Sequence, residues 1–220
     1  MAGKSFKGKT VLLTAGPTHE PIDPVRFIGN HSTGKMGYAL AEGFAQRGAS
    51  VLLVAGPTNL QAEHQNISVT KVITADEMYT AVLRQADTAD IWVFAAAVAD
   101  YKPRAAADKK IKKSGNELTI ELVKNVDIAA ALGQRKKTGQ FSVGFALETH
   151  DEGANAREKL RKKNLDMIVL NSLNDAGAGF RHDTNKITII EKDATTAFGL
   201  KQKTEVAQDI INLIWDRLHG

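Results

Sequence analysis

The stretch from position 23 to position 37 carries most of the side chains that could do chemistry. It holds a cation that could meet a carboxylate or phosphate, Arg26, and an amide that could grip a carbonyl, Asn30. The run Ser32-Thr33-Gly34-Lys35 follows, and its backbone could approach an anion where a helix begins. An ordinary helix cap would explain why Ser32 or Thr33 is present, but it would not explain Arg26, Asn30 and Lys35. We therefore expect a ligand-binding loop here.

A second candidate stretch is Ala95-Ala96-Ala97-Val98-Ala99-Asp100. The small residues could simply permit tight packing of a helix on a sheet. They could equally leave backbone exposed to a ligand, with Asp100 accepting a hydrogen bond from a base or ribose. Because the stretch ends an apolar segment that reads as a central strand, we favour the functional interpretation.

Apolar segments and amphipathic segments alternate along the chain, and this alternation must position both stretches. It predicts a Rossmann-like α/β fold with a doubly wound, mostly parallel sheet flanked by helices, in a single domain from 1 to 220. The predicted strands cover residues 10–15, 51–55, 69–73, 91–97, 141–147, 165–170 and, at an edge, 186–190. The predicted helices cover residues 34–47, 75–86, 126–132, 151–163 and 203–218.

Ligands of such sheets bind beyond the carboxyl ends of the strands. The loops 16–33, 56–65 and 98–113 should therefore converge at one site. The alternation breaks at residues 110–113 and 118–123, where apolar Leu118, Ile120 and Leu122 alternate with polar residues. This pattern predicts an inserted β-hairpin or flap, about residues 104–123, that could reach over the site or toward a partner.

Composition narrows the classes of protein. The chain has 220 residues, 43% hydrophobic and 25% charged, with no cysteine, which excludes disulfides, thiolate metal sites and a cysteine nucleophile. No apolar run approaches the ~20 residues that span a bilayer, and the first nine residues lack the apolar region of a signal peptide. We expect a cytoplasmic protein without membrane contact. Basic clusters at 109–113, 135–137 and 157–163 suit anions, either nucleotide phosphates or a nucleic-acid backbone.

Known nucleotide motifs fit poorly. Gly16-Pro17-Thr18-His19-Glu20 is not a dinucleotide fingerprint. Residues 29–35 match a P-loop, but Met36 replaces the magnesium-binding Ser or Thr, and more than a dozen residues separate the match from its strand. A P-loop-like kinase and a basic nucleic-acid-binding module remain the alternatives; aromatic residues, at 6%, are scarce for the latter. The histidines show no metal-binding spacing.

Several short motifs, which follow one another in a fixed order along the chain, indicate a protein family more specifically than any single motif does. They are Thr14-Ala15-Gly16-Pro17-Thr18, Asp23-Pro24-Val25-Arg26, Asn30-His31-Ser32-Thr33-Gly34-Lys35-Met36-Gly37, Ala96-Ala97-Val98-Ala99-Asp100-Tyr101, Lys110-Ile111-Lys112-Lys113, Val143-Gly144-Phe145-Ala146 and Lys163-Asn164-Leu165-Asp166. With them the chain resembles the phosphopantothenoylcysteine synthetase family of coenzyme A biosynthesis over nearly its whole length.

The resemblance implies a ligase with three substrates, 4'-phosphopantothenate, L-cysteine and CTP. An acyl-cytidylate would form with release of pyrophosphate, and cysteine would then displace CMP. CTP is expected rather than ATP because the motifs follow the bacterial pattern. The resemblance also implies Mg²⁺ on the nucleotide, a homodimer, and a flavin-dependent decarboxylase that is fused or a partner. No flavin is expected in this chain, and no nucleic acid as partner.

The resemblance also assigns residues. Asn30 and Lys110 are the catalytic candidates, while Arg26, Asn30, Ala96 and Ala97 are expected to bind substrate. The expected nucleotide-binding residues are Gly16, Ser32, Gly34, Lys35, Asp100, Lys110, Val126, Asp127, Ile128, Ala129, Phe145, Lys159 and Lys163. Val126 departs from the family's Asn-Pro-Asp-Ile segment, and the metal ligands are unassigned. Alternatively, Phe145 belongs to the core, Lys159 and Lys163 to a solvated helix face, and Arg26 to a surface ion pair.

Overall fold

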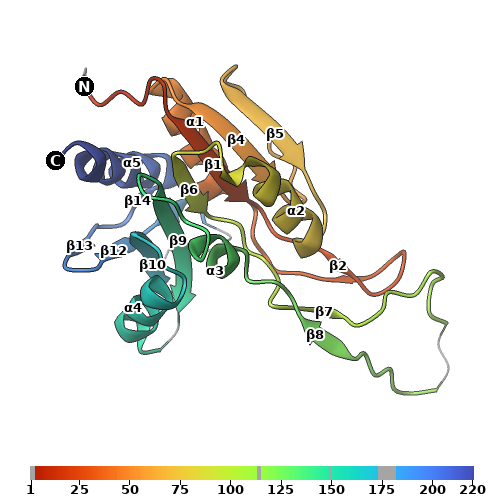
Figure 1. Cartoon of the computed structure of the whole chain (residues 1–220). Helices are drawn as coiled ribbons and strands as arrows, with labels where there is room; N and C mark the ends of the chain where they lie inside the picture. Colours follow the sequence, from red (N-terminus) through yellow and green to blue (C-terminus); the bar gives the residue numbers. More distant parts are fainter. Residues whose placement is uncertain (1–2, 113–114, 149, 173–181) are drawn as a thin grey trace.

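Apolar segments of the chain form a central parallel sheet in the computed structural model, which describes residues 3–112, 115–148, 150–172 and 182–220 (Figure 1). The parallel strands are β1 (Thr10–Ala15), β4 (Ser50–Ala55), β5 (Ile67–Lys71), β6 (Ile91–Phe94), β9 (Phe141–Glu148) and β10 (Met167–Ser172). Two antiparallel strands, β12 (Ile187–Glu191) and β13 (Thr195–Ala197), extend one edge. The eight-stranded order is β13-β12-β10-β9-β6-β1-β4-β5. The predicted mostly parallel, doubly wound sheet is confirmed.

The sheet reverses its winding direction between β1 and β6. From β1 the chain proceeds to β4 and β5 on one side, then returns to β6 and continues to β9 and β10 on the other. Leu12 of β1 is in register with Leu52 of β4 and with Trp92 of β6, so β1 lies fully inside the sheet. A crevice beyond the carboxyl ends of the strands at such a reversal is where ligands bind in this type of sheet.

Helices cover both faces of the sheet (Figure 1). Side chains on successive residues of β1 point to opposite faces, so Val11 and Leu13 enter one core and Leu12 the other. The first core is closed by α1 (Lys35–Gln46) and α5 (Lys203–His219), and the second by α2 (Ala75–Ala86), α3 (Ile128–Gly133) and α4 (Glu152–Lys162). Strands buried on both faces explain the continuous apolar runs in the sequence.

Four strand predictions were wrong in detail. β5 begins and ends two residues before the predicted 69–73, and β10 begins and ends two residues after the predicted 165–170. β6 ends at Phe94 rather than Ala97, because the amide of Ala96 turns to the Thr14 hydroxyl, 3.3 Å away, and Ala97 only bridges Pro17. The strand near residues 186–190 is not an edge, because β13 pairs outside it through Thr195, Thr196 and Ala197. That polar segment offers no apolar alternation from which a strand could be predicted.

The predicted hairpin exists, but its paired strands lie elsewhere. Pairing joins β7 (Tyr101–Pro103) to β8 (Leu122–Lys124), whereas residues 110–112 are not in a strand. Leu118 and Leu122 are exposed, so their alternation with polar residues does not bury an apolar face. We call residues 101–112 and 115–124 the arm; it projects from the body at the right of Figure 1.

Short strand pairs brace the rest of the structure. A hairpin of β2 (Glu20–Pro21) and β3 (Phe27–Ile28) lies next to β7 at the base of the arm, and β11 (Thr184–Asn185) pairs with β14 (Lys201–Gln202) beside α5. In the part of the chain that the structure describes, no helix has the length and apolar character that crossing a bilayer requires.

Candidate functional site

A cavity of about 240 Å³, here the first cavity, lies beyond the carboxyl ends of β6 and β9. Its walls come from the end of β6 and the loop after it, the segment leading into α3, strand β9, and one side of α4. Ten of the residues predicted from the sequence line it: Ala96, Ala97, Asp100, Val126, Asp127, Ile128, Ala129, Phe145, Lys159 and Lys163. Residues 50 or more positions apart in sequence therefore meet in one place.

Lys159 of α4 and Lys163, the C-cap residue of this helix, form a basic wall of the first cavity, and acidic partners hold them. Lys163 lies 3.0 Å from a carboxylate oxygen of Asp127, and Lys159 pairs with Glu148. Asp127 also caps α3, because its other oxygen accepts a hydrogen bond from the amide of Ala130 at 3.0 Å. A single carboxylate thus fixes both the start of α3 and the end of Lys163.

A second cavity of about 160 Å³ adjoins the first. It is lined by the start of α1, the alanines after β6, and residues from β9, β10, β11 and α5. Ala96, Ala97 and Phe145 line both cavities. Ser32, Gly34 and Lys35, predicted from the sequence as an anion-binding run, line the second. The two cavities together can hold a ligand with two distinct ends.

The second cavity is electropositive. Gly34, at the N-cap of α1, has no side chain to cap the first amides of the helix, and its φ of 79° suits glycine. Lys203, only 8% exposed, also lines the cavity and donates to the carbonyl of His182. Burial, and secondly the nearby charge of Lys35, lower the pKa of Lys203. Lys35 itself pairs with Asp183. Helix amides, the buried Lys203 and the more exposed Lys35 together favour a bound anion.

Asn30 joins the walls of the two cavities. Its side-chain nitrogen donates to the carbonyl of Ala97, and its side-chain oxygen accepts from the amide of Ser32 at 3.2 Å. Asn30 therefore contacts the alanine segment of both cavities and the anion-binding run of the second. The structure brings together Asn30, Ala97 and Ser32, while their expected binding and catalytic roles stay predictions.

Gly16 packs against the N-cap of α1 and against the turn after β4. It has a φ of 79°, and a Cβ on Gly34 would lie 3.4 Å from its Cα. A Cβ on Gly16 would in turn lie 3.3 Å from the carbonyl oxygen of Gly56. Thr58, in the same loop as Gly56, donates to the carbonyl of Thr33 at 3.0 Å. The loop 56–65, predicted to converge on the site, thus buttresses it.

Arg26 and Lys110 lie apart from the described walls of the two cavities. Arg26 pairs with Asp23 and donates to the carbonyl of Ile111 at 3.2 Å. Lys110 is an exposed residue of the arm, and Lys113 of the same motif lies outside the described residues. The substrate role of Arg26 and the catalytic role of Lys110 stay predictions.

The structure adds residues that the sequence analysis missed. Asn171 and Asn185 line the second cavity and hydrogen-bond each other at 2.9 Å. Asn125 lines the first cavity and donates to the carbonyl of Ala99 at 2.8 Å, while its own side-chain oxygen is buried without a partner among the described residues. Asn171 could have been predicted from the sequence, because it is a polar residue at the end of an apolar strand. The sequence around Lys203 contains no feature that indicates a site residue.

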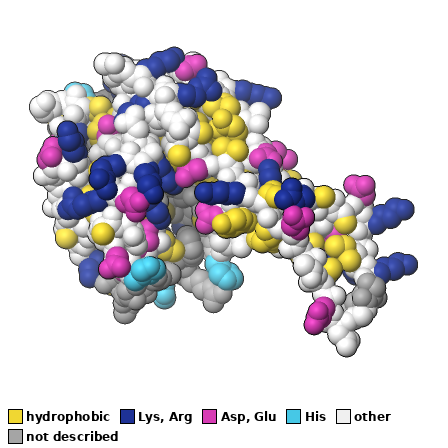
Figure 2. Space-filling view, turned by 60° about the horizontal axis from the view of Figure 1, so that its bottom comes forward, with side chains coloured by type: hydrophobic (Ala, Val, Ile, Leu, Met, Phe, Trp, Pro, Cys, Tyr) yellow, Lys and Arg dark blue, Asp and Glu magenta, His cyan; other side chains and the backbone are white. Residues whose placement is uncertain are grey.

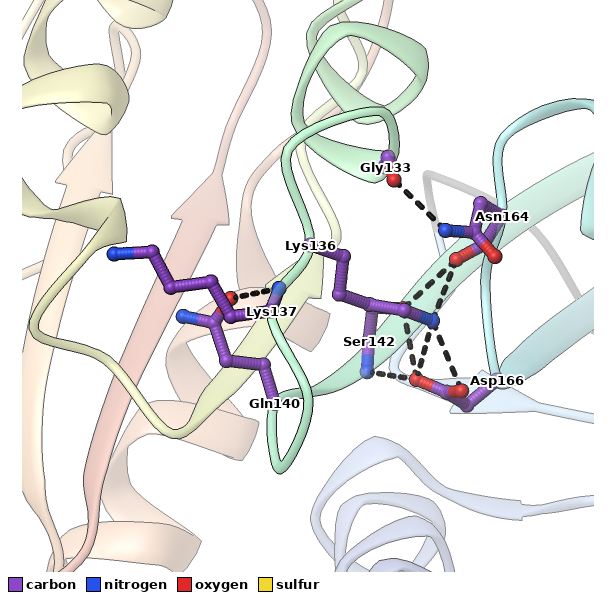
Figure 3. A network of polar contacts seen from close by, with 7 residues as sticks. All are labelled: Gly133, Lys136, Lys137, Gln140, Ser142, Asn164 and Asp166. Carbon is purple, nitrogen blue, oxygen red and sulfur yellow. Dashed lines mark hydrogen bonds and ion pairs between the residues drawn. The ribbon is translucent and has the colours of Figure 1, made fainter.

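In the basic clusters at 135–137 and 157–163, carboxylates pair with Lys136, Lys137, Lys159, Lys162 and Lys163. Lys136 contacts both oxygens of Asp166, at 2.9 and 3.0 Å, the Asn164 carbonyl at 2.7 Å and the Ser142 hydroxyl at 3.2 Å (Figure 3). This network holds the turn that directly follows Lys163. On the visible face of the molecule, basic and acidic side chains alternate over the body (Figure 2). Such interspersed charges do not form the continuous basic surface that a nucleic-acid backbone requires.

No group of three or more His, Asp or Glu side chains among the described residues could by itself hold a metal ion. Asp100 and Asp127 are the carboxylates that line the first cavity. This arrangement fits an ion that would be held mainly by a ligand, with at most a few protein oxygens.

Comparisons with known proteins agree with this geometry. Residues 6–218 match the family described as DNA/pantothenate metabolism flavoprotein C-terminal domain. The coenzyme A biosynthesis bifunctional proteins CoaBC of Haemophilus influenzae and Bacillus subtilis are 46% and 47% identical over 97% and 95% of the chain. A relative from an unknown prokaryotic organism, named cysteine/cysteine sulfinic acid decarboxylase, is 54% identical over 98% of the chain. The chain spans 53%, 52% and 60% of these three proteins, respectively.

Solved structures match along the full length. The crystal structure of the C-terminal domain of CoaBC is 39% identical with a TM-score of 0.83, and the match covers 98% of both chains. A DNA/pantothenate metabolism flavoprotein from Streptococcus pneumoniae, 23% identical over 95% of this chain and 99% of that one, shares the fold with a TM-score of 0.80. The chain therefore belongs to the family of the DNA/pantothenate metabolism flavoprotein C-terminal domain, the phosphopantothenoylcysteine synthetases that its motifs indicated.

Proposed function

We propose that this chain is a phosphopantothenate–cysteine ligase that uses CTP. The observation that carries the proposal is the pair of adjoining cavities that share Ala97, whose carbonyl oxygen accepts a hydrogen bond from the side chain of Asn30. One cavity offers polar backbone and carboxylate groups suited to a nucleoside, and the other offers helix amides, the buried Lys203 and the exposed Lys35, which suit an anion. A mixed anhydride of a phosphorylated acid and a nucleotide has these same two ends.

The chemistry needs charge neutralisation and alignment more than a protein nucleophile. The carboxylate of 4'-phosphopantothenate attacks the α-phosphate of CTP, and pyrophosphate leaves. The amine of cysteine then attacks the acyl carbon, loses a proton, and CMP leaves. Lys159 and Lys163 line the nucleotide end, and Lys35 and Lys203 line the anion end. The amide of Asn30 would orient the acyl group between them.

Two features support an amino-substituted base such as cytosine. Asp100 and the segment 126–129 form the wall of the first cavity where a base would lie. Asn125 adds a side-chain oxygen that has no donor among the described residues. The exocyclic amino group of cytosine or adenine can donate a hydrogen bond, whereas uracil presents an oxygen at that position. UTP should therefore be a poor substrate.

Mg²⁺ is the metal ion that this reaction requires in our proposal. The ion would supply charge neutralisation on the triphosphate and be held mainly by phosphate oxygens and water, with few protein ligands, because both oxygens of Asp127 already contact Lys163 and the amide of Ala130. Arg26 and Lys110 would reach the ligands from the base of the arm and from the arm itself. No flavin is expected in this chain.

A second copy of the chain is the partner that we propose for the arm. Phe27, Tyr101, Leu118 and Leu122 are between 44% and 53% exposed, and they belong to the arm and to β3 at its base. Apolar side chains also follow the projecting arm in Figure 2. Such exposure is typical of a surface that another protein covers.

The flavin-dependent decarboxylase step would belong to the rest of a longer protein or to a separate partner. Relatives that are twice as long carry the word bifunctional in their names. The decarboxylase name of the 54% identical relative can refer to the part of it that this chain does not cover. We propose a cytoplasmic location, with the other enzymes of coenzyme A synthesis.

The half-reaction tests the proposal directly. Pyrophosphate release is measured with phosphopantothenate and each of CTP, ATP and UTP, in the absence of cysteine. Release with CTP that depends on phosphopantothenate is expected. Absence of release with any nucleotide contradicts the proposal, and a nucleoside diphosphate as product would favour the kinase alternative. Salt-dependent RNA or DNA binding without nucleotide chemistry would favour the nucleic-acid module.

One variant tests the junction of the cavities. Asn30→Asp places a negative charge beside the acyl phosphate, so turnover should fall sharply. Asn116→Asp introduces the same change at an exposed position of the arm and should leave turnover unchanged. Wild-type turnover in the Asn30→Asp variant would refute the role of Asn30.

A further inference from the structure

Asp23 is a buried carboxylate in the turn at the base of the arm, and the proposed chemistry leaves it without a role. It is 3% exposed, and its side chain has no solvent contact at all in the ion pair with Arg26. A buried carboxylate is costly unless hydrogen-bond donors surround it. Asp23 therefore has to be explained by the groups that it accepts from.

The two oxygens of Asp23 do different things. Oδ1 accepts from the amides of Val25 and Arg26, both at 2.9 Å, which forms the local turn. Oδ2 accepts from Nε of Arg26 at 3.1 Å, from its Nη2, and from the amide of Ile111 at 3.1 Å. Ile111 lies 88 residues further along the chain. A tight turn explains Oδ1 but leaves the contact with Ile111 unexplained.

The Asp23–Arg26 pair binds both backbone groups of Ile111. Asp23 accepts from its amide, and Nη2 of Arg26 donates to its carbonyl oxygen at 3.2 Å. A further backbone bond, from the amide of Ala107 to the carbonyl of Ile22 at 2.9 Å, ties the same part of the arm to the same loop. We call the Asp23–Arg26 pair on Ile111 the clip.

Lys110 directly precedes Ile111. Consecutive Cα atoms are about 3.8 Å apart, so fixing both backbone groups of Ile111 also fixes where the backbone of Lys110 lies. The side chain of Lys110 is exposed and keeps its own rotational freedom. The clip therefore fixes the position of the Lys110 backbone, from which its side chain extends. Asp23 and Arg26 belong to the same loop as Asn30.

We propose that Asp23 is a positioning residue, which together with Arg26 clips the backbone of Ile111 and thereby places Lys110 for catalysis. The inference rests on the proposed function, which gives Lys110 its catalytic role. It also gives Arg26 a defined task, holding the arm, in place of or beside contact with substrate.

The test compares Asp23→Asn with Asp108→Asn, which changes an exposed carboxylate in the same part of the arm. Hydrogen exchange at the amides of Ile111 and Ala107 should become faster in Asp23→Asn and stay unchanged in Asp108→Asn. A misplacement of about 1 Å can cost on the order of 100-fold in rate, so kcat should fall by about 10- to 100-fold while the KM for CTP changes little. Unchanged exchange at Ile111, or unchanged kcat, would overturn the proposal.

A double variant separates positioning from general damage. If Asp23 acts through Lys110, Asp23→Asn should have no further effect on kcat once Lys110→Ala is present. Equal fold losses in both backgrounds would show that Asp23 acts by another route and would overturn the proposal. Should Asp23→Asn not fold, Arg26→Lys serves instead, because it keeps a charge beside Asp23 but lacks the guanidinium that reaches the carbonyl of Ile111.

The exchange measurement needs no substrate. If the wild-type chain releases no pyrophosphate with any nucleotide, the proposed function fails. Faster exchange at Ile111 in Asp23→Asn would even then show that the clip holds the arm, and the claim about Lys110 would fall with the function.

Discussion

Lys203 shows how a single residue can serve the site at a cost to folding. The residue is 8% exposed, and burial and the charge of Lys35 lower the pKa of its ammonium group, against the weaker opposing effect of Asp183. A buried cation with a lowered pKa is held less favourably in the folded chain than in water. A residue with only a structural task would be better filled by an apolar side chain, which indicates that Lys203 is present for an anionic ligand.

The first prediction follows at this scale. Lys203→Met should leave the free energy of unfolding close to that of the wild type, because the loss of the bond to the His182 carbonyl is offset by removal of a buried charge. A hydrogen bond to a charged group contributes about 1.5–3 kcal/mol, so the KM for phosphopantothenate or CTP should rise by roughly 10-fold or more. Urea unfolding and steady-state kinetics measure the two effects. Lys192→Met, at an exposed position, is the control; equal KM values in both variants would contradict the prediction.

At the scale of elements, the turns after β1 and β4 pack against each other and hold the loop that leads to Asn30. A Cβ on Gly56 would lie 1.7 Å from the carbonyl oxygen of Pro17, far inside any allowed contact. The amide of Gly56 also donates to the carbonyl of Ala15 at 2.9 Å, so the backbone there is held in place. The close approach of these two turns requires glycine.

Gly56→Ala should therefore lower the free energy of unfolding by about 3 kcal/mol or more, or prevent folding. The matched variant is Gly153→Ala, at an exposed position of α4 where a Cβ would meet nothing within 4 Å. Replacing glycine inside a helix removes backbone freedom from the unfolded chain, so this variant should gain roughly 0.5–1 kcal/mol. Urea unfolding of both variants and of the wild type measures these changes in the free energy of unfolding. A Gly56→Ala variant as stable as the wild type would show that the two turns can move apart.

Elements with strong local signals were predictable from the sequence. β1 and α2 have the predicted bounds, since β1 is a short apolar run ended by Gly-Pro and α2 begins at a capping box of Thr74 and Glu77. Residues 110–112 were predicted as part of a hairpin strand. In the structure the hairpin pairs β7 with β8 instead, and residues 110–112 pair with no strand. Where pairing depends on distant segments, local pattern is not sufficient.

The candidate site was predictable to the extent that it follows the parallel strands. The rule that ligands bind beyond their carboxyl ends placed Ser32, Ala97 and Asp100 correctly at the cavity walls. Asn185 and Lys203 come from β11 and α5, beyond the parallel part of the sheet, and only tertiary packing brings them to the second cavity. No spacing in the sequence encodes that approach.

At the scale of the whole molecule, the clip should appear in the pH dependence of stability. The side chain of Arg26, together with backbone amides, holds the pKa of Asp23 far below its ordinary value of 3.8. A carboxyl group with a lowered pKa in the folded state stabilises fully above its unfolded pKa, and this contribution is lost as the pH falls below that value. The wild type should therefore lose more stability between about pH 4 and pH 2 than Asp23→Asn, which has no such group. If urea unfolding showed that both chains lose the same free energy of unfolding between pH 4 and pH 2, this prediction would be contradicted.

The last prediction concerns both halves of the sheet. The cavity walls come from β1, β6, β9 and β10 and from the helices that follow them, so a ligand bound there contacts elements on either side of the winding reversal. A ligand that binds only the folded chain at 100 times its Kd stabilises it by about 2.7 kcal/mol. In a chain of this size that corresponds to a rise of roughly 5 to 11 °C in Tm. Calorimetry with CTP and Mg²⁺ should show this rise, and UTP at the same concentration should give a smaller one. If CTP at concentrations that saturate turnover left Tm unchanged, CTP would not bind the folded chain preferentially, and the proposed nucleotide site would be contradicted.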